Sequence, residues 1–78
     1  MSKTVVYSKP ACKYCELTKT WLKMNSIEYS EVNVLEDDEA LGRIKDAGFM
    51  TLPVIEKDGE FIASGFNPSQ LIQSYFYA

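Results

Sequence analysis

Short apolar runs and helical stripes follow one another along the first half of the chain. Residues 4–7 are β-branched or aromatic and stop at a proline turn, as expected for a central strand with apolar side chains on both faces. Residues 13–25 repeat apolar positions at steps of three and four, which predicts an amphipathic helix that begins at a cysteine pair. We expect its stripe to face the core, with Trp21 packed inside; the stripe comprises Tyr14, Leu17, Trp21 and Met24. Residues 27–34 hold β-compatible types without a breaker and predict a second strand.

An acidic cluster opens the second helical pattern. Residues 36–39 are all Asp or Glu, which suits the positive end of a helix dipole, and a helical stripe then runs as far as Gly48. The stripe comprises Ala40, Leu41, Ile44 and Ala47. A bare acidic run is an unspecific signal for a metal ion. We therefore interpret the cluster as the solvated start of a helix.

A hairpin and a third helix complete the pattern. Residues 52–55 and 60–63 are short apolar runs on either side of an Asp-Gly pair, which is a strong signal for an antiparallel hairpin. Asn67 is a good helix-capping residue, and Pro68 suits the first helical position. A helix is therefore expected to follow the hairpin.

The order of the elements, βαβαββα, indicates the fold class. A crossover unit followed by a hairpin and a helix gives a four-stranded mixed sheet flanked by three helices. A chain of 78 residues is long enough for one compact domain and too short for two. We expect an α/β fold with a single domain over residues 1–78, which resembles the smallest thioredoxin-type layout.

Composition and charge narrow the classes of function. The net charge is −3, and the scattered lysines form no basic stripe for a phosphate backbone, so no nucleic-acid partner is expected. The sequence has neither an apolar run of about 18 residues nor an apolar signal segment. We expect no membrane association and a cytoplasmic location, where thiols are mostly kept reduced.

The two cysteines, Cys12 and Cys15, stand at the expected start of the first helix. A bridge between them closes a loop too short to constrain the unfolded chain strongly, so redox chemistry explains the pair better. Free N–H groups and the helix dipole favour a thiolate there, and Lys9 and Lys13 add positive charge. We predict that the pKa of Cys12 lies below that of free cysteine, that Cys12 attacks disulfides, and that Cys15 resolves the mixed disulfide.

Metal binding and a purely structural role of the cysteine pair stay open. Zinc or an iron-sulfur cluster needs four ligands, so two thiols without any histidine require a second chain or an external thiol. The structural role would be an inert bridge or two free core cysteines, and the charged flanks and the proline turn disfavour both. We expect no bound metal or cofactor.

Pro53 interrupts an otherwise apolar strand. A proline removes a ladder donor, so it belongs at a strand edge, a bulge or a cis turn. If the Leu52–Pro53 bond is cis, the local backbone turns toward the cysteines and can pair with an extended peptide. An ordinary edge-strand proline is the alternative.

The chain resembles the glutaredoxins in two segments. These are residues 7–15, Tyr-Ser-Lys-Pro-Ala-Cys-Lys-Tyr-Cys, and residues 51–54, Thr-Leu-Pro-Val, which look like a glutaredoxin active site and its cis-proline loop. A narrower similarity, in residues 47–55 and 64–68, is to the NrdH-redoxins. These are glutaredoxin-like proteins with thioredoxin-like activity that deliver electrons to ribonucleotide reductase.

The resemblance implies a dithiol-disulfide oxidoreductase in which Cys12 is the nucleophile and Cys15 the resolving thiol. It also implies ribonucleotide reductase as the partner and recycling of the Cys12–Cys15 disulfide by NADPH through thioredoxin reductase, with NADPH not bound by this chain. We expect a monomer. The substrate-binding residues expected from the resemblance are Lys9, Tyr14, Thr51, Leu52, Pro53, Ser64, Gly65 and Phe66.

A glutathione-dependent dithiol glutaredoxin is the alternative. Lys9, Tyr14 and Thr51 match positions that contact glutathione in classical glutaredoxins. Many glutaredoxins open the last helix with Gly-Gly and an acidic residue, whereas this chain has Ser64-Gly65 and no acid there. The missing side-chain partner for the ammonium group of glutathione favours the NrdH-type interpretation, although helix N–H groups could still hold a carboxylate.

Overall fold

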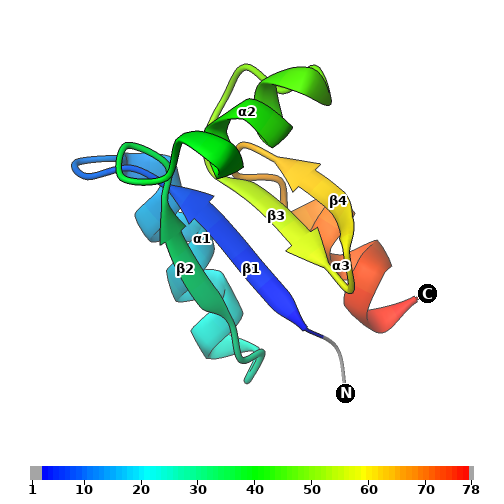
Figure 1. Cartoon of the computed structure of the whole chain (residues 1–78). Helices are drawn as coiled ribbons and strands as arrows, with labels where there is room; N and C mark the ends of the chain where they lie inside the picture. The colour runs from blue at the N-terminus through cyan, green and yellow to red at the C-terminus, as the bar shows by residue number, and fades with distance from the viewer. Residues whose placement is uncertain (1–2, 78) are drawn as a thin grey trace.

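The computed structural model describes residues 3–77. Its elements, in chain order, are β1 (Thr4–Ser8), α1 (Lys13–Met24), β2 (Ser30–Asn33), α2 (Asp38–Asp46), β3 (Val54–Lys57), β4 (Glu60–Ser64) and α3 (Pro68–Phe76), as Figure 1 shows. The predicted order of strands and helices is therefore confirmed.

The four strands form one mixed sheet with the order β2-β1-β3-β4. β1 pairs in parallel with β2, with Val5 opposite Ser30, and antiparallel with β3, with Val6 opposite Ile55. β3 and β4 form the antiparallel hairpin that the Asp-Gly pair predicts. β1 is thus a central strand, as its apolar run indicates, and its carboxyl end leads to the cysteine pair.

The helices cover both faces of the sheet (Figure 1). α1 and α3 lie on one face, where Leu22 and Leu71 pack against Val6 and other strand residues. α2 lies on the other face, where Ile44 packs against Val5. Because side chains alternate along a strand, β1 contributes to both cores. This is the four-stranded, three-helix α/β architecture expected of the thioredoxin fold.

α1 does not bury the stripe that its apolar spacing predicts. The members of the stripe that are exposed are Tyr14, Leu17 and Met24. The buried face consists of Cys15, Thr18 and Leu22, which have the same spacing displaced by one residue, or about 100° around the helix. Trp21 is half-buried and packs at the edge of the core against Phe76. Because the buried row includes the polar residue Thr18, the hydrophobic pattern does not predict this face as the buried one.

Two strands differ in extent from the prediction. β2 covers Ser30–Asn33 and not residues 27–34, because the Ile27 N–H donates to the Leu22 carbonyl and closes the end of α1. β3 starts at Val54, one residue after Pro53, which has no N–H for the ladder. Both strands start later than predicted because a backbone N–H is not available for the sheet: that of Ile27 is bonded to α1, and Pro53 has none.

Side chains cap the last two helices as their residue types predict. Asp37 accepts a hydrogen bond from the Ala40 N–H at 3.0 Å, and Asn67 accepts one from the Gln70 N–H at 3.3 Å. The acidic cluster thus supplies the cap of α2. Between residues 3 and 77, no helix has the length and apolar character needed to cross a membrane.

Candidate active site

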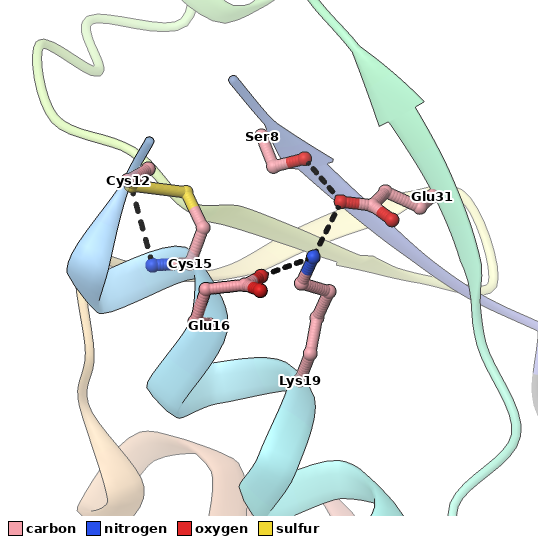
Figure 2. Close-up of polar contacts among 6 residues, drawn as sticks. All are labelled: Ser8, Cys12, Cys15, Glu16, Lys19 and Glu31. Atoms are coloured by element: carbon pink, nitrogen blue, oxygen red, sulfur yellow. Dashed lines mark hydrogen bonds and ion pairs between the residues drawn. A yellow bond between two sulfur atoms is a disulfide. The ribbon is translucent and has the colours of Figure 1, made fainter. Parts of the chain in front are cut away.

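Cys12 and Cys15 form a disulfide at the start of α1 (Figure 2). Cys12 is the N-cap residue, and its Sγ accepts a hydrogen bond from the Cys15 N–H, with 3.2 Å between sulfur and nitrogen. Ala11 precedes it with a φ of 58°, so the chain turns through the left-handed region between β1 and the helix. The expectation that the first cysteine meets the free N–H groups of a helix is confirmed.

The two sulfur-bearing residues differ in access. Cys12 is 9% exposed and Cys15 is 1% exposed, with 5.2 Å between their Cα atoms. The helix dipole and the N–H contact stabilise negative charge on the Cys12 sulfur when the pair is reduced. An external disulfide can therefore reach Cys12, while Cys15 lies behind it, placed to react with whatever Cys12 has bound.

A groove of about 900 Å³ opens beside Cys12. One wall is the start of α1 with the loop before it, and the other is the end of α2 with the loop before β3. The groove brings together Cys12 and four of the predicted substrate contacts, namely Lys9, Tyr14, Thr51 and Leu52. Residues from both halves of the chain thus meet at the reactive sulfur.

The lining of this groove is cationic and apolar, although the protein as a whole is acidic. Its charged residues are Lys9, Lys13 and Lys45, and no Asp or Glu of residues 3–77 belongs to the lining. Its apolar residues include Leu41, Ile44, Phe49 and Met50, the last of them almost fully exposed. The groove suits a ligand that offers apolar groups, negative charge or both.

The loop before β3 contains a cis peptide bond between Leu52 and Pro53. Pro53 is buried, and its carbonyl accepts a hydrogen bond from the Gly65 N–H at 2.7 Å. The Thr51 Oγ1 lies 2.8 Å from the Ser64 Oγ. The end of β4 and the residue after it therefore support this loop from behind.

Four predicted substrate contacts lie outside the lining of the groove. They are Pro53, Ser64, Gly65 and Phe66. Phe66 is half-buried, and Gly65 has a φ of 72°, a backbone conformation that glycine adopts readily. A direct contact of these residues with substrate stays a prediction.

A second hollow, of about 740 Å³, also reaches Cys12 and contains a polar cluster (Figure 2). The Lys19 ammonium pairs with Glu16 and lies 2.9 Å from the Glu31 carboxylate, to which the Ser8 hydroxyl donates at 2.7 Å. Hydrogen bonds to Glu16 and Glu31 raise the pKa of Lys19, and bonds from Lys19 and Ser8 lower the pKa of Glu31. This cluster was not predicted from the sequence. The available signal was the three-residue spacing of Glu16 and Lys19, which allows an ion pair on one face of a helix.

A second polar cluster joins α2 to the sheet. The buried Glu56 carboxylate, in β3, accepts hydrogen bonds from the Tyr7 hydroxyl at 2.9 Å and from the Arg43 guanidinium, which also donates to Tyr7. Burial and the bond to Glu56 raise the pKa of Tyr7, and bonds to Glu56 and Tyr7 raise the pKa of Arg43. In the sequence, the available signal for this cluster is Glu56, a single acidic residue within an apolar strand. Because α2 leads into the loop before β3, this cluster holds one wall of the groove.

The Cys12–Cys15 pair is the disulfide-exchange group that the residue types provide. The sequence contains two cysteines and no histidine. In the part of the chain that the structure describes, no group of three or more His, Cys, Asp or Glu side chains is arranged to hold a metal ion.

Comparisons with known proteins extend over most of the chain. The glutaredoxin family profile matches residues 4–62. The glutaredoxin-like protein NrdH of Lactococcus lactis subsp. cremoris is 42% identical over 66 residues, which cover 85% of this chain and 90% of that protein. The solved structure of NrdH-redoxin from Escherichia coli, a glutaredoxin-like protein with a thioredoxin-like activity profile, matches with a TM-score of 0.85 at 26% identity, covering 97% of each chain. The thioredoxin-like protein BC3987 matches with a TM-score of 0.77 at 34% identity, covering 90% of this chain and 96% of that one.

Proposed function

This chain belongs to the glutaredoxin family and is a thiol-disulfide oxidoreductase, and from that premise we propose that it carries electrons to a protein disulfide through Cys12 and Cys15. The supporting observation is the position of Cys12. It caps α1, its sulfur accepts the Cys15 N–H, and it borders the groove between α1 and the loop before β3. No bound cofactor is needed, because the dithiol itself holds the two electrons.

In the proposed reaction, the Cys12 thiolate attacks one sulfur of the substrate disulfide. A bond forms between the two sulfurs, and the other substrate sulfur leaves as a thiolate. Cys15 then loses its proton and attacks the Cys12 sulfur, so that the second substrate thiolate leaves. Two electrons have passed to the substrate, and the Cys12–Cys15 disulfide of this structure is the oxidised product.

The groove supplies the proposed substrate contacts. Under this proposal Lys9, Tyr14, Thr51 and Leu52 contact the substrate from the lining of the groove. Ser64 and Gly65 hydrogen-bond to the loop that carries Thr51, and Pro53, Ser64, Gly65 and Phe66 are proposed as further substrate contacts. The backbone of the loop before β3 is the proposed partner for an extended substrate segment.

Ribonucleotide reductase is the proposed electron acceptor, and thioredoxin reductase with NADPH is the proposed source of electrons. The similarity to NrdH of Lactococcus lactis and to the NrdH-redoxin of Escherichia coli supports both. Under this proposal the protein acts as a monomer in the cytoplasm.

Recycling by glutathione is the second candidate, and the charge of the groove favours it. Lys9, Lys13 and Lys45 line the groove without a carboxylate among the described lining residues. Glutathione carries two carboxylates, so it matches a cationic groove. This candidate changes the reductant and leaves the roles of Cys12 and Cys15 the same.

A parallel assay of disulfide reduction tests the proposal. The protein is supplied with NADPH and thioredoxin reductase in one arm, and with NADPH, glutathione and glutathione reductase in the other, with Cys12→Ser as the control in both. We expect turnover in the first arm, and ribonucleotide reductase to turn over with this protein as its only dithiol. Turnover in the glutathione arm alone contradicts the proposed reductant, and no turnover in either arm contradicts the proposed function.

A further inference from the structure

Cys12 lies where the groove and the second hollow meet. Both are lined by Cys12 itself and by three residues around it, namely Lys9, Ala11 and Lys13. The groove continues to the end of α2 and the loop before β3, whereas the second hollow continues to β2 and the loop that follows it, which lies beside the loop before α1 (Figure 1). Because β1 lies between β2 and β3 in the sheet, these two regions are on opposite sides of the loop that carries Cys12.

The two linings differ in charge away from the residues that they share. On the groove side the further charged residue is Lys45, in the last turn of α2, and no carboxylate of residues 3–77 belongs to that lining. The second hollow holds Glu16, Glu31 and Glu36 against one further ammonium, that of Lys19. Lys19 pairs with both Glu16 and Glu31, so this cluster has a net negative charge when all three are ionised. The reactive sulfur thus lies at a boundary between positive and negative surface.

Glu36 and Lys45 carry unpaired charges on the two sides of this boundary. Both residues are exposed, and within residues 3–77 neither forms an ion pair. The Glu36 N–H donates to the Asn33 carbonyl at 3.0 Å, so a turn after β2 places Glu36 beside the second hollow. Lys45 is placed by α2, in which the neighbouring Ile44 is buried against the sheet. Both charges are therefore available to a ligand of opposite charge.

We propose that the groove and the second hollow form one docking surface for an extended segment of a protein substrate, with the disulfide of the segment over Cys12. The segment carries an acidic side chain on the side of Lys45 and a basic side chain on the side of Glu36, because each then meets opposite charge. The carboxylates of glutathione find matching charge only on the groove side. The inference rests on the proposed reduction of protein disulfides and adds the charge pattern of the substrate.

Three disulfide peptides with blocked ends and the same central ring provide the probes. One has acidic residues before the ring and basic residues after it, the second has the same residues in the reverse order, and the third is neutral. Their reduction by the pre-reduced protein is followed in single-turnover reactions. At low ionic strength we expect one charged order to react about threefold to tenfold faster than the other. The difference should shrink at about 1 M salt, where the screening length is about 3 Å.

Exchange of the two unpaired charges tests where the preference arises. Glu36→Lys and Lys45→Glu should each lower the ratio of the faster to the slower order, and together they should remove or reverse the preference. The double variant keeps the net charge of −3. Its matched control is Lys3→Glu combined with Glu60→Lys, at two exposed residues outside both linings, which should keep the wild-type ratio. If a reversed charge prevents folding, Glu36→Gln and Lys45→Gln carry the same test with a smaller expected effect.

The outcomes separate this inference from the proposed function. Equal rates for the two charged orders in the wild-type protein, or a preference that the double exchange leaves unchanged, overturn the inference. An effect of Lys45→Glu without one of Glu36→Lys also overturns it, since the groove alone then selects charge, as it would for glutathione. A wild-type protein that reduces none of the three peptides contradicts the proposed function.

Discussion

Two cysteines only three positions apart have different surroundings in this protein. The Cys12 sulfur accepts a backbone N–H at the start of a helix and borders two hollows, whereas Cys15 is buried beneath it. Access and electrostatics thus favour the same cysteine as the first nucleophile. The difference in burial also keeps Cys15, the proposed resolving thiol, from reacting with an external disulfide first.

Substitution of each cysteine should therefore have a different result. We expect Cys12→Ser to reduce disulfide turnover to the background rate, because no other thiolate is accessible. Cys15→Ser should retain the first attack and accumulate a mixed disulfide, detected by mass spectrometry under non-reducing conditions. Turnover retained by Cys12→Ser, or no mixed disulfide with Cys15→Ser and a competent substrate, contradicts the assigned order.

Individual site residues could be predicted from the sequence where the residue type itself is reactive or belongs to a recognisable motif. Cys12, Lys9, Tyr14 and Thr51 could be named in advance, and the structure places them around one groove, with Cys15 buried behind Cys12. Lys45 and Met50 also line it and were not predicted. Lys45 belongs to no motif, and Met50 had no role assigned within the segment 47–55; the packing of α2 against the sheet brings both near Cys12.

At the scale of elements, α1 shows that hydrophobic spacing and burial can disagree. Leu17 is 39% exposed and Leu22 is fully buried between the sheet and α3. The helix must present Cys15 toward the sheet, and that orientation leaves the predicted stripe at the surface. Tyr14, which is exposed, thereby becomes available to the groove.

The two leucines make a matched test of that orientation. We expect Leu22→Ala to lower the free energy of unfolding by about 2–5 kcal/mol, because it leaves a cavity in the core. Leu17→Ala should cost less than about 1 kcal/mol, since its side chain already contacts solvent. Urea unfolding of both variants provides the measurement, and equal losses would show that the observed rotation of α1 is wrong.

Glu31 links β2 to α1 through Lys19, so its ionisation affects how these elements are held together. Lys19 and Ser8 keep the pKa of Glu31 below its usual value, which means that folding favours the carboxylate. The stability it contributes is fully present above the unfolded-state pKa of about 4.3 and is lost as the pH falls through the lower folded-state pKa. Because the Glu31 side chain is 42% exposed, solvent screens the interaction and the effect is small.

We expect Glu31→Gln to be less stable than wild type at neutral pH, with the difference shrinking as the pH falls from about 5 to about 3. Thermal unfolding measured across this range checks the expectation. The control is Glu28→Gln, an exposed acid shortly before β2. A Glu31→Gln difference that stays constant over this range, or one that the control reproduces, contradicts the role of the Lys19 cluster.

At the scale of the whole molecule, the position of the groove depends on how α2 is attached to the sheet. Arg43 in α2 binds Glu56 in β3, and Tyr7 in β1 binds the same carboxylate. The Arg43 guanidinium also lies 5.3 Å from the centre of the Phe61 ring. Three elements distant in the sequence are thus connected through one buried acid.

Removing the Arg43 partner of Glu56 alone should destabilise the protein more than removing it and neutralising Glu56 as well. We expect Arg43→Met to lower the thermal midpoint, because Glu56 is left as a buried charge with only the Tyr7 hydroxyl. Adding Glu56→Gln should recover most of the loss, since a neutral amide oxygen can still accept from Tyr7. A double variant less stable than Arg43→Met in the same thermal scan contradicts this account of the cluster.

The sequence by itself determined the order of the elements, the helix caps and the placement of Cys12 at a helix start. These features depend on neighbouring residues: periodicity, capping types such as Asp37 and Asn67, and the three-residue step between the cysteines. The tertiary structure alone decided which face of α1 is buried, the charge of the groove and the contacts behind Thr51. Such features join residues that are distant in the chain, 13 positions for Thr51 and Ser64 and 49 for Tyr7 and Glu56, and only strand pairing and helix packing bring them together.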